Sequence, residues 1–592
     1  MERQTIPQNM KWKITDIFPS DEAWEEEFKQ VENTYGNYDF SVFKGKLGDK
    51  KELLACFALN DEMSRRLEKL YLYAHMRHDE DVRVSRYASA NSQVGALISK
   101  IFAEFSFVEP ELTALDESVL QSFIADPDFA PYEYRLRKIA ASKKHVLSEG
   151  EEKLLTLAGD VMREFRGVFT MLDNANLNLP KAMLNGEEVQ MSHGLYGVAL
   201  HSDNAEDRKV WFEKYYEAYI KLIDSIAQTY YGNVKKDVFF KTAKKYESCM
   251  AMAMDGEDVD PKVYENLIEA VHEALPAVHD YIFTRKKVLG LEEQHMYDIY
   301  APLVENADIK LPFNEAYDLV VEGLAPLGED YQNLLRKGKN EGWIDVCEND
   351  GKRSGAYSTG VYDVHPFVLL NYQETTNDMF TVAHEMGHAL HTYKSNETQP
   401  YAKADYTIFL AEIASTVNEV LLLKHLYKKT DDKNLKKYLL SYYMDMMRAT
   451  LFRQTQFAEF EQIAHAKAEA GEPLTKDNLN AVYYELNKQY YGEGIIHDEQ
   501  IAYEWARIPH FYNSFYVYKY ATGIISAISI VKRILTEGEP AVKDYFRFLS
   551  SGGCTDPVSI LKGAGVDLTT KAPFEVAMGE FKATLEEFKS LL

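Results

Sequence analysis

Apolar residues recur at steps of three and four positions along most of the chain, which is the period of a helix that buries one face. The pattern is clearest, with few breaking residues, over 51–86, 149–171, 207–233, 261–288 and 407–428. An acidic residue before Pro261 is also typical of a helix start. We therefore predict a mainly α-helical protein.

The helical pattern first stops at residues 173–204, which are rich in asparagine and glycine. Within them, Asn185-Gly186 lies between short apolar runs and is typical of a two-residue β-hairpin turn. We place a domain boundary at this interruption. It divides the chain into an N-terminal helical domain, residues 1–195, and a second domain, residues 196–592.

The helical pattern stops again at residues 338–372. Here 356–362 and 367–370 have the composition of short strands, and Gly355, Gly360 and Pro366 flank them. We expect a small β-sheet just before the next helical segment.

The charge balance narrows the possible partners. The chain carries 93 acidic and 66 basic residues, a formal net charge of −27, which is unfavourable for binding nucleic acid or an anionic membrane surface. The N-terminus lacks a basic segment followed by an apolar run, and no stretch approaches the roughly 18 apolar residues of a membrane span. We expect a cytoplasmic protein, with leaderless export as the alternative. The residues indicate no oligomeric state.

The helical segment after the predicted sheet contains the pattern H-E-x-x-H, formed by His384, Glu385 and His388. Positions four apart on a helix share a face with Cβ atoms ~5–6 Å apart, so both imidazoles can reach one zinc ion. Glu385 then lies beside the water molecule at that ion and can act as general base. The alternative is a chance match of this pattern on a helix.

A catalytic zinc ion takes three protein ligands, so a third one is needed. Glu412 lies on a second predicted helix among apolar and small residues. A buried salt bridge is the alternative, but a buried carboxylate needs a counter-charge, which zinc supplies. We predict one zinc ion per chain, held by His384, His388 and Glu412. Ser415 and Glu419 follow on the same face and could orient either histidine, with packing or solvent exposure as the alternative.

These motifs, H-E-M-G-H-A-L-H at 384–391 and F-L-A-E-I-A-S-T at 409–416, resemble oligoendopeptidase F and, more distantly, the thimet-oligopeptidase-like zinc peptidases. The resemblance covers most of the chain and includes G-K-R-S-G-A-Y at 351–357 and I-P-H-F-Y-N-S-F-Y-V-Y-K-Y-A-T-G at 508–523. It implies an elongated, mostly helical body divided by a deep channel, with the zinc ion at the channel floor. It also implies that short unfolded peptides are cut at internal bonds.

The resemblance further implies roles for the C-terminal histidine and tyrosines. His510 and Tyr518 are expected to stabilise the oxyanion of the reaction, and Tyr512 to bind substrate. The alignment needs a one-residue gap, so Tyr516 or Tyr520 could replace Tyr518 and are otherwise expected to contact substrate. Core packing is the alternative for each tyrosine.

Residues 356–362, with Ala356 and Tyr357 at their start, could pair with an extended peptide through backbone hydrogen bonds. The predicted function is a zinc endopeptidase for short peptides. One alternative is a zinc dipeptidyl carboxypeptidase, which would need a group such as Arg353 or Arg507 to capture a terminal charge. Another is a non-catalytic zinc-containing peptide-binding protein, which an intact Glu385 disfavours. An aminopeptidase is disfavoured because the chain has no G-x-M-E-N motif.

Overall fold

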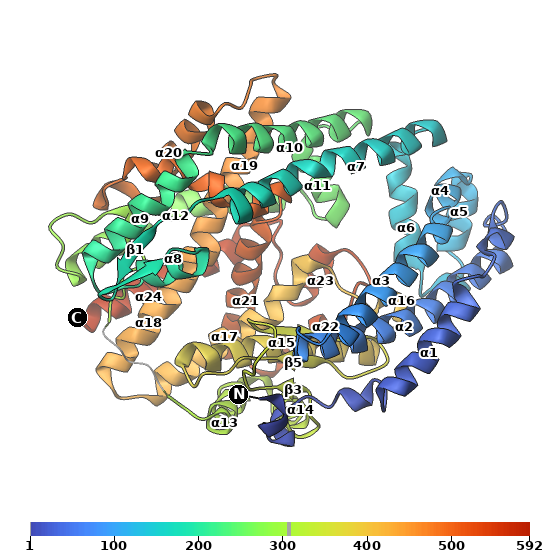
Figure 1. Ribbon diagram of the computed structural model, residues 1–592, viewed down its shortest axis with the longest axis horizontal. Coiled ribbons are helices and arrows are strands. Elements are labelled where there is room, and N and C mark those ends of the chain that lie inside the picture. The colour runs from blue at the N-terminus through green and yellow to red at the C-terminus, as the bar shows by residue number, and fades with distance from the viewer. Residues whose placement is uncertain (1, 305–309) are drawn as a thin grey trace. The chain divides into compact units, whose positions relative to one another are not determined.

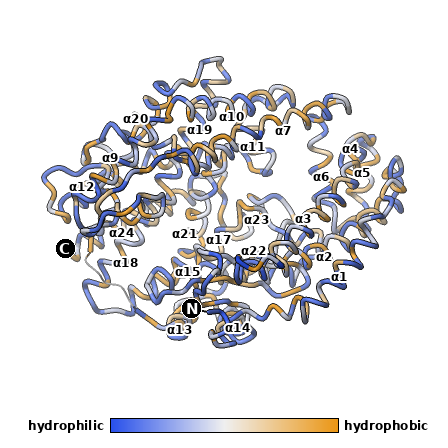
Figure 2. Tube along the Cα trace, in the orientation of Figure 1, coloured by the Kyte–Doolittle hydropathy of each residue, from blue (hydrophilic) through white to orange (hydrophobic). Residues whose placement is uncertain are grey.

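A computed structural model describes residues 2–304 and 310–592, and most of these residues lie in helices (Figure 1). The predicted helical class is therefore confirmed. Figure 2 shows hydrophobic and hydrophilic residues alternating along the helices, as the three- and four-residue periodicity requires. No helix within the described ranges is long and apolar enough to span a membrane.

The chain forms two compact units, each assembled from three segments. Unit 1 comprises Met1–Val146, Asp308–His425 and Ile530–Gly565, and unit 2 comprises Leu147–Ala307, Leu426–Ser529 and Val566–Leu592. The divisions at His425 and at Ser529 fall inside helices. The two compact units are each made of segments that alternate along the chain, so they do not correspond to two consecutive domains. A domain boundary at residue 195 stays a prediction.

Unit 1 contains the predicted small sheet and the helices around it. Its strands β3, β4 and β5 lie in the order β3-β5-β4, with β3 parallel and β4 antiparallel to β5. The elements of this unit are α1 (Asp21–Tyr35), α2 (Lys50–Glu80), α3 (Ser85–Phe105), α4 (Val108–Ala114), α5 (Glu117–Ile124), α6 (Glu133–Ser142), α13 (Phe313–Gly323), α14 (Glu329–Asn340), β3 (Ile344–Asp345), β4 (Tyr357–Thr359), β5 (Phe367–Leu369), α15 (Thr376–Thr398), α16 (Tyr401–Ala404), α17 (Ile408–Lys429), α22 (Glu539–Leu549) and α23 (Pro557–Gly563).

The hydrophobic core of unit 1 joins its N-terminal helices to the sheet. Buried side chains of α1 to α6 form one cluster that also includes Phe367 and Leu369 of β5. Helix α15 packs against β4, β5, α13 and α14. The sheet is thus fixed between the N-terminal core and α15, the helix with the H-E-x-x-H pattern.

Unit 2 is built of long packed helices and one hairpin. Helix α10 packs against α7 and α19, and α12 packs against α20 and α24. The elements of this unit are α7 (Glu149–Met171), β1 (Lys181–Leu184), β2 (Glu187–Gln190), α8 (His193–Leu200), α9 (Ala205–Ile220), α10 (Ile223–Ala243), α11 (Cys249–Glu257), α12 (Lys262–Val288), α18 (Lys433–Met447), α19 (Arg453–Glu469), α20 (Lys476–Tyr491), α21 (Tyr518–Glu537) and α24 (Ala572–Ser590).

The predicted hairpin is confirmed: β1 and β2 pair antiparallel, and the turn residues Asn185 and Gly186 have φ angles of 52° and 84°. The predicted helices agree closely for α7 and α12. Two predicted segments are each divided in the structure, 51–86 into α2 and the start of α3, and 207–233 into α9 and α10. Apolar periodicity continues across both breaks, so the pattern alone could not locate them.

Candidate active site

The start of α15 is fixed by a capping box. The Thr375 hydroxyl accepts a hydrogen bond from the Asp378 backbone N–H at 3.1 Å, and the Asp378 carboxylate accepts one from the Thr375 N–H at 2.9 Å. The helix then runs unbroken through the H-E-x-x-H residues.

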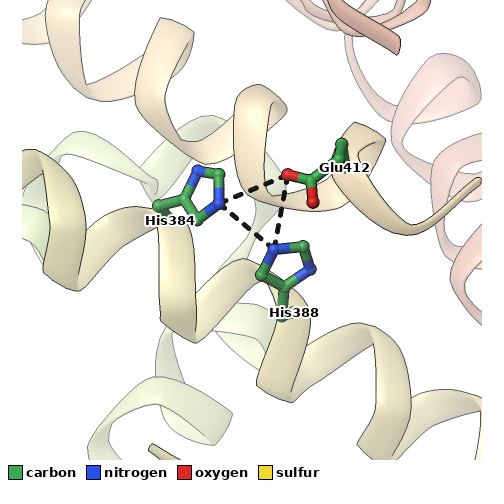
Figure 3. Close-up of side chains that lie close together, drawn as sticks. All are labelled: His384, His388 and Glu412. Atoms are coloured by element: carbon green, nitrogen blue, oxygen red, sulfur yellow. Dashed lines mark hydrogen bonds and ion pairs between the residues drawn. The ribbon is translucent and has the colours of Figure 1, made fainter. Parts of the chain in front are cut away.

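Three potential metal ligands meet where α15 and α17 lie together (Figure 3). His384 Nε2 lies 3.1 Å from His388 Nε2 and 3.4 Å from Glu412 Oε2, and His388 Nε2 lies 3.6 Å from the same oxygen. At zinc–ligand bonds of about 2.0–2.1 Å, a tetrahedron separates its ligand atoms by about 3.3 Å. The observed spacing fits one small metal ion.

The hydrogen bond behind His384 fixes the imidazole for metal binding. Glu419 Oε1 lies 2.5 Å from His384 Nδ1, and an ionised carboxylate can only accept a hydrogen bond. The proton therefore belongs on Nδ1, which leaves the Nε2 lone pair directed at His388 and Glu412. The sequence suggested Glu419 for this position, and the structure brings the two side chains together.

The electrostatic field of the site favours a cation. Burial lowers the pKa of His384, but the Glu412 and Glu419 carboxylates outweigh it and raise the pKa to about 10. Burial raises the pKa of Glu412, but hydrogen bonds with His384 and His388 hold it well below its usual range. A metal ion can take the place of the proton that these groups attract. Glu412 is 37% exposed, so the site is open to an incoming molecule.

Glu385 lies on α15 between the two histidines and is only 7% exposed. Burial raises the pKa of its carboxyl group. A carboxylate with a raised pKa is suited to take up a proton and release it again near neutral pH. This environment agrees with the general-base role expected from the sequence.

Ser415 has a different partner from the one expected. Its hydroxyl donates to the Glu412 backbone carbonyl at 2.9 Å and lies 3.5 Å from Glu412 Oε2, so it contacts the third ligand and neither histidine. A serine hydroxyl on a helix readily reaches a carbonyl one turn back, which explains the difference.

Two residues that the sequence did not indicate join the helices of the site. Gly387 on α15 approaches α17 so closely that an added Cβ would lie 2.5 Å from the Ser415 Cα atom. Asn418, which is fully buried on α17, donates to the Ala383 carbonyl of α15 at 2.9 Å. A polar residue on the apolar face of 408–429 was the available signal for Asn418.

Strand β4, where the sequence expected a peptide to pair, is confirmed at Tyr357–Thr359 and packs against α15. It forms one margin of the three-stranded sheet, and Ala356 and Tyr357 are half-buried. The Tyr357 hydroxyl donates to Asp79 Oδ2 at 2.9 Å, which tethers the strand to α2. The structure therefore brings this strand and the potential metal ligands into the same unit.

The expected C-terminal residues lie in unit 2 and separate into two groups. His510 is exposed, and Tyr516 and Tyr520 are half-buried beside it, with the Tyr520 hydroxyl 3.4 Å from His510 Nε2. The His510 and Tyr516 rings stack with their centroids 6.0 Å apart. In contrast, Tyr518 is 1% exposed and Tyr512 is 6% exposed.

The two buried tyrosines pack within the helices of unit 2. The Tyr518 ring lies 5.2 Å from the Tyr264 ring, and the Tyr512 ring stacks 4.4 Å from Phe169. Burial raises the pKa of Tyr518 above its usual range. The oxyanion-stabilising role of Tyr518 and the substrate-binding role of Tyr512 stay predictions, and Tyr516 and Tyr520 are the more accessible residues.

A buried polar network holds the loop between His510 and α21. Ser514 Oγ donates to Asp237 Oδ2 at 2.6 Å, and the Phe515 N–H donates to Glu461 Oε1 at 3.0 Å. Phe515 has φ 58°, a left-handed conformation that a bulky residue rarely adopts. These contacts with α10 and α19 therefore fix the backbone just before Tyr516 and, with it, the direction of the Tyr516 side chain.

Known proteins are similar to this chain in sequence and in fold. The model of Peptidase family M3 matches residues 198–580, and a second family model, described as Oligopeptidase F, matches residues 111–178. Oligopeptidase PepF of Bacillus subtilis is 42% identical, over 100% of this chain and 88% of the relative. Group B oligopeptidase PepB of Streptococcus agalactiae is 40% identical, over 100% of this chain and 98% of the relative.

A solved structure agrees with these matches. The crystal structure of oligoendopeptidase-F from Enterococcus faecium has a TM-score of 0.73 with this chain at 32% identity, covering 96% of this chain and 97% of the other. The resemblance deduced from residues 384–391 and 409–416 is thus confirmed over the full chain. The family match, the relatives aligned over the whole chain and the His-His-Glu cluster together show that the chain belongs to Peptidase family M3.

Proposed function

We propose that this chain is a zinc-dependent endopeptidase that cuts short peptides at internal bonds. The observation that carries the proposal is the convergence of His384, His388 and Glu412 at metal-ligand spacing, with Glu385 on the same helix. Two imidazoles and one carboxylate with an open side form the ligand set of catalytic zinc sites. Membership of Peptidase family M3 and the oligopeptidase relatives support the reaction class.

The proposed reaction is hydrolysis of a peptide bond. A zinc ion at this site supplies Lewis-acid chemistry, by lowering the pKa of a water molecule to about 7 and polarising the scissile carbonyl. Glu385 accepts a proton from that water molecule and later delivers it to the leaving amine. Its raised pKa makes the first transfer easier, since the protonated carboxyl is less costly in a buried position.

Residues around the ligands keep the site in one geometry. Glu419 holds His384 in the tautomer that leaves Nε2 free, and Asn418 ties α17 to the Ala383 carbonyl on α15. The close approach at Gly387 sets the spacing between the two helices and hence between the histidines and Glu412. A catalytic site needs such a fixed arrangement because small misplacements cost large factors in rate.

We propose that substrate binds as an extended strand beside β4. Backbone hydrogen bonds from a strand give affinity without requiring a particular sequence, which suits a peptidase for varied peptides. Oxyanion stabilisation by His510 and the neighbouring tyrosines is a proposal from the family resemblance. Within unit 2, Tyr516 and Tyr520 are the accessible tyrosines next to His510. The channel and the cytoplasmic location stay predictions.

A zinc dipeptidyl carboxypeptidase is the alternative enzyme. Of the two arginines considered for terminal-charge capture, Arg353 is paired with Asp79 at 3.2 Å and Arg507 with Glu504 at 2.7 Å. A direct test uses one peptide in two forms, with free ends and with acetylated and amidated ends, and identifies the products by mass spectrometry. An endopeptidase cuts both forms at the same internal bond. Removal of dipeptides from the free form alone would support the alternative.

A further inference from the structure

Unit 2 contains an arginine pair that shares a single carboxylate. Arg507 Nη2 donates to Glu504 Oε1 at 2.7 Å, and Arg453 donates to the same oxygen. The other oxygen of Glu504 accepts a hydrogen bond from the Tyr483 hydroxyl. One negative charge therefore faces two guanidinium groups, whose side chains are 14% exposed for Arg453 and 18% for Arg507.

A second arginine pair in the same unit repeats this imbalance. Arg448 Nε donates to Asp445 Oδ1 at 3.0 Å, and Arg285 Nη1 lies 3.6 Å from Asp445 Oδ2. In the described part of the chain, the ion pairs of the four arginines involve two carboxylates, Asp445 and Glu504. Buried positive charge without a counter-charge is costly, so the surplus calls for an explanation.

The Arg448 side chain lies over the ring of Tyr300, and Arg453, of the other pair, follows Arg448 by five positions in the same run of helix. The Arg448 guanidinium carbon lies 4.6 Å from the centre of the Tyr300 ring. Burial raises the pKa of Tyr300, but the charges of Arg453, Arg448 and Arg507 outweigh it and lower the pKa below its usual value. The surroundings of Tyr300, a half-buried residue, thus favour a negative charge on its hydroxyl.

Two donors of these four arginines, Arg448 Nη1 and Arg285 Nε, lack an acceptor within the described ranges. Among the described residues, Arg448 Nη1 has no hydrogen-bond partner, although Arg448 is only 3% exposed. Buried polar groups in folded proteins are nearly always hydrogen-bonded, and an unsatisfied charged donor is especially costly. An acceptor oxygen supplied by a ligand would satisfy it.

The arginine pair at Glu504 is close in the chain to a residue expected to act on substrate, since Arg507 lies three positions before His510. Burial lowers the pKa of His510, and the positive charges of Arg453 and Arg166 lower it further. Arg453, Arg507 and His510 all belong to unit 2. A peptide held at His510 could present a nearby anionic group to these arginines.

We propose that Arg448, Arg453 and Tyr300 form a binding site for a carboxylate of the peptide substrate, supplied either by its C-terminus or by an acidic side chain. The planar guanidinium fork matches a carboxylate, and charge-assisted hydrogen bonds are the stronger kind. The site would give the enzyme a preference for one charged substrate position. This inference rests on the proposed peptidase function.

Binding to the full, zinc-loaded Glu385→Gln protein tests the site without hydrolysis. The probes are three forms of one fluorescent peptide: a free C-terminus without acidic side chains, its amide, and the amide with one glutamate added. We expect one of the two carboxylate-bearing forms to bind about tenfold more tightly than the uncharged amide, and that form identifies the source. The net charge of −27 by itself would favour the reverse order. Equal affinity for all three forms would overturn the proposal.

Two variants place the preference at this cluster. Tyr300→Phe removes the central hydroxyl, and Arg453→Lys keeps a positive charge beside Glu504 but loses the guanidinium fork. Both should reduce the carboxylate preference at least about threefold and leave binding of the amide form unchanged. Tyr490→Phe is the matched control, since its buried hydroxyl bonds Glu459 at 2.8 Å instead. A preference that persists in both variants would place the site elsewhere.

The two proposals can fail separately. If zinc-loaded wild-type protein cuts the peptides but the Glu385→Gln protein binds all forms equally, the carboxylate site is wrong and the peptidase function stands. If the carboxylate preference is present but no form is cut, the peptidase function is wrong and the site remains as a peptide-binding feature.

Discussion

Glu385 and Glu412 lie beside the same two histidines, but their surroundings suit them to different roles. Burial raises the pKa of Glu385, whereas hydrogen bonds with His384 and His388 hold the pKa of Glu412 low despite its burial. A carboxylate that stays ionised is a good metal ligand, and one that protonates more readily is a good proton carrier.

This difference predicts opposite effects from the same substitution. Glu385→Gln should keep the zinc ion and lower kcat by about 10²–10⁴-fold, because the amide retains the shape but accepts no proton. Glu412→Gln should release zinc more readily, because a neutral ligand replaces an anionic one. Zinc content after dialysis against one chelator, together with kcat, distinguishes the two. Equal zinc retention in both variants would remove Glu412 from the ligand set.

Glu419 acts on the metal through His384. Replacing it in Glu419→Gln removes the charge that favours the Nδ1 proton, 2.5 Å away, and should weaken zinc binding by about 10- to 100-fold. Competition with a chromophoric chelator measures this affinity. An unchanged affinity would mean that His384 is oriented by its packing alone.

The tyrosines near His510 differ in solvent exposure, so we expect their substitutions to differ in their effect on the rate of hydrolysis. Tyr516→Phe or Tyr520→Phe should lower kcat and kcat/KM by similar factors, on the order of 10²–10³ for loss of one oxyanion donor. Tyr518→Phe should keep most activity because its side chain is 1% exposed. Steady-state kinetics of the three variants, each with its zinc content checked, decide the order. Loss of activity in Tyr518→Phe alone would contradict this order and support Tyr518 as the oxyanion donor, as the family resemblance implies.

At the scale of elements, the contact between α15 and α17 positions the third ligand. In an ordinary helix, Gly→Ala is stabilising by about 1 kcal/mol. At Gly387 the added methyl would lie 2.5 Å from the Ser415 Cα atom, so the helices must separate. We expect Gly387→Ala to destabilise the protein by about 1–3 kcal/mol and to weaken zinc binding.

A matched control makes this prediction specific. Gly95 lies inside α3 of the same unit, and an added Cβ there would meet no atom within 4 Å. Gly95→Ala should therefore stabilise the protein or leave it unchanged. Urea denaturation with the zinc-free proteins compares the two variants. A Gly387→Ala protein as stable as the Gly95→Ala protein would show that the helices need not approach so closely.

Several of these elements could be predicted from the sequence because local patterns determine them. The H-E-x-x-H spacing places two ligands on one helical face. A two-residue hairpin turn needs positive φ angles, which asparagine and glycine adopt more readily than most residues, so Asn185-Gly186 predicts the turn. Glu412 and Glu419 were found because carboxylates are rare on an apolar helix face.

The difference in burial between Tyr516 and Tyr518 could not be predicted from local patterns. Tyr516 precedes α21 and Tyr518 begins it, so helical periodicity does not relate their directions. The left-handed Phe515 and the contacts of Ser514 with Asp237 decide them instead. The Asp237 and Glu461 contacts are long-range, and no local pattern in the sequence indicates them.

At the scale of the whole molecule, the potential metal ligands all belong to unit 1 and the His510 cluster to unit 2. Zinc binding therefore tests the ligand residues of unit 1 alone. Hydrolysis, in the proposed mechanism, also needs His510 and the neighbouring tyrosines of unit 2. A measurement that follows zinc uptake and hydrolysis together tests the central claim, that the metal held by unit 1 is the centre of a peptidase.

The most direct test is to titrate zinc into the metal-free protein and follow hydrolysis of an internally quenched peptide with blocked ends. The rate should rise linearly and level off at one zinc ion per chain, as expected for a single site formed by His384, His388 and Glu412. The Glu385→Gln protein should take up the same amount of zinc with almost no hydrolysis. Hydrolysis that continues without metal, or that is unchanged in Glu385→Gln, would contradict the proposed mechanism.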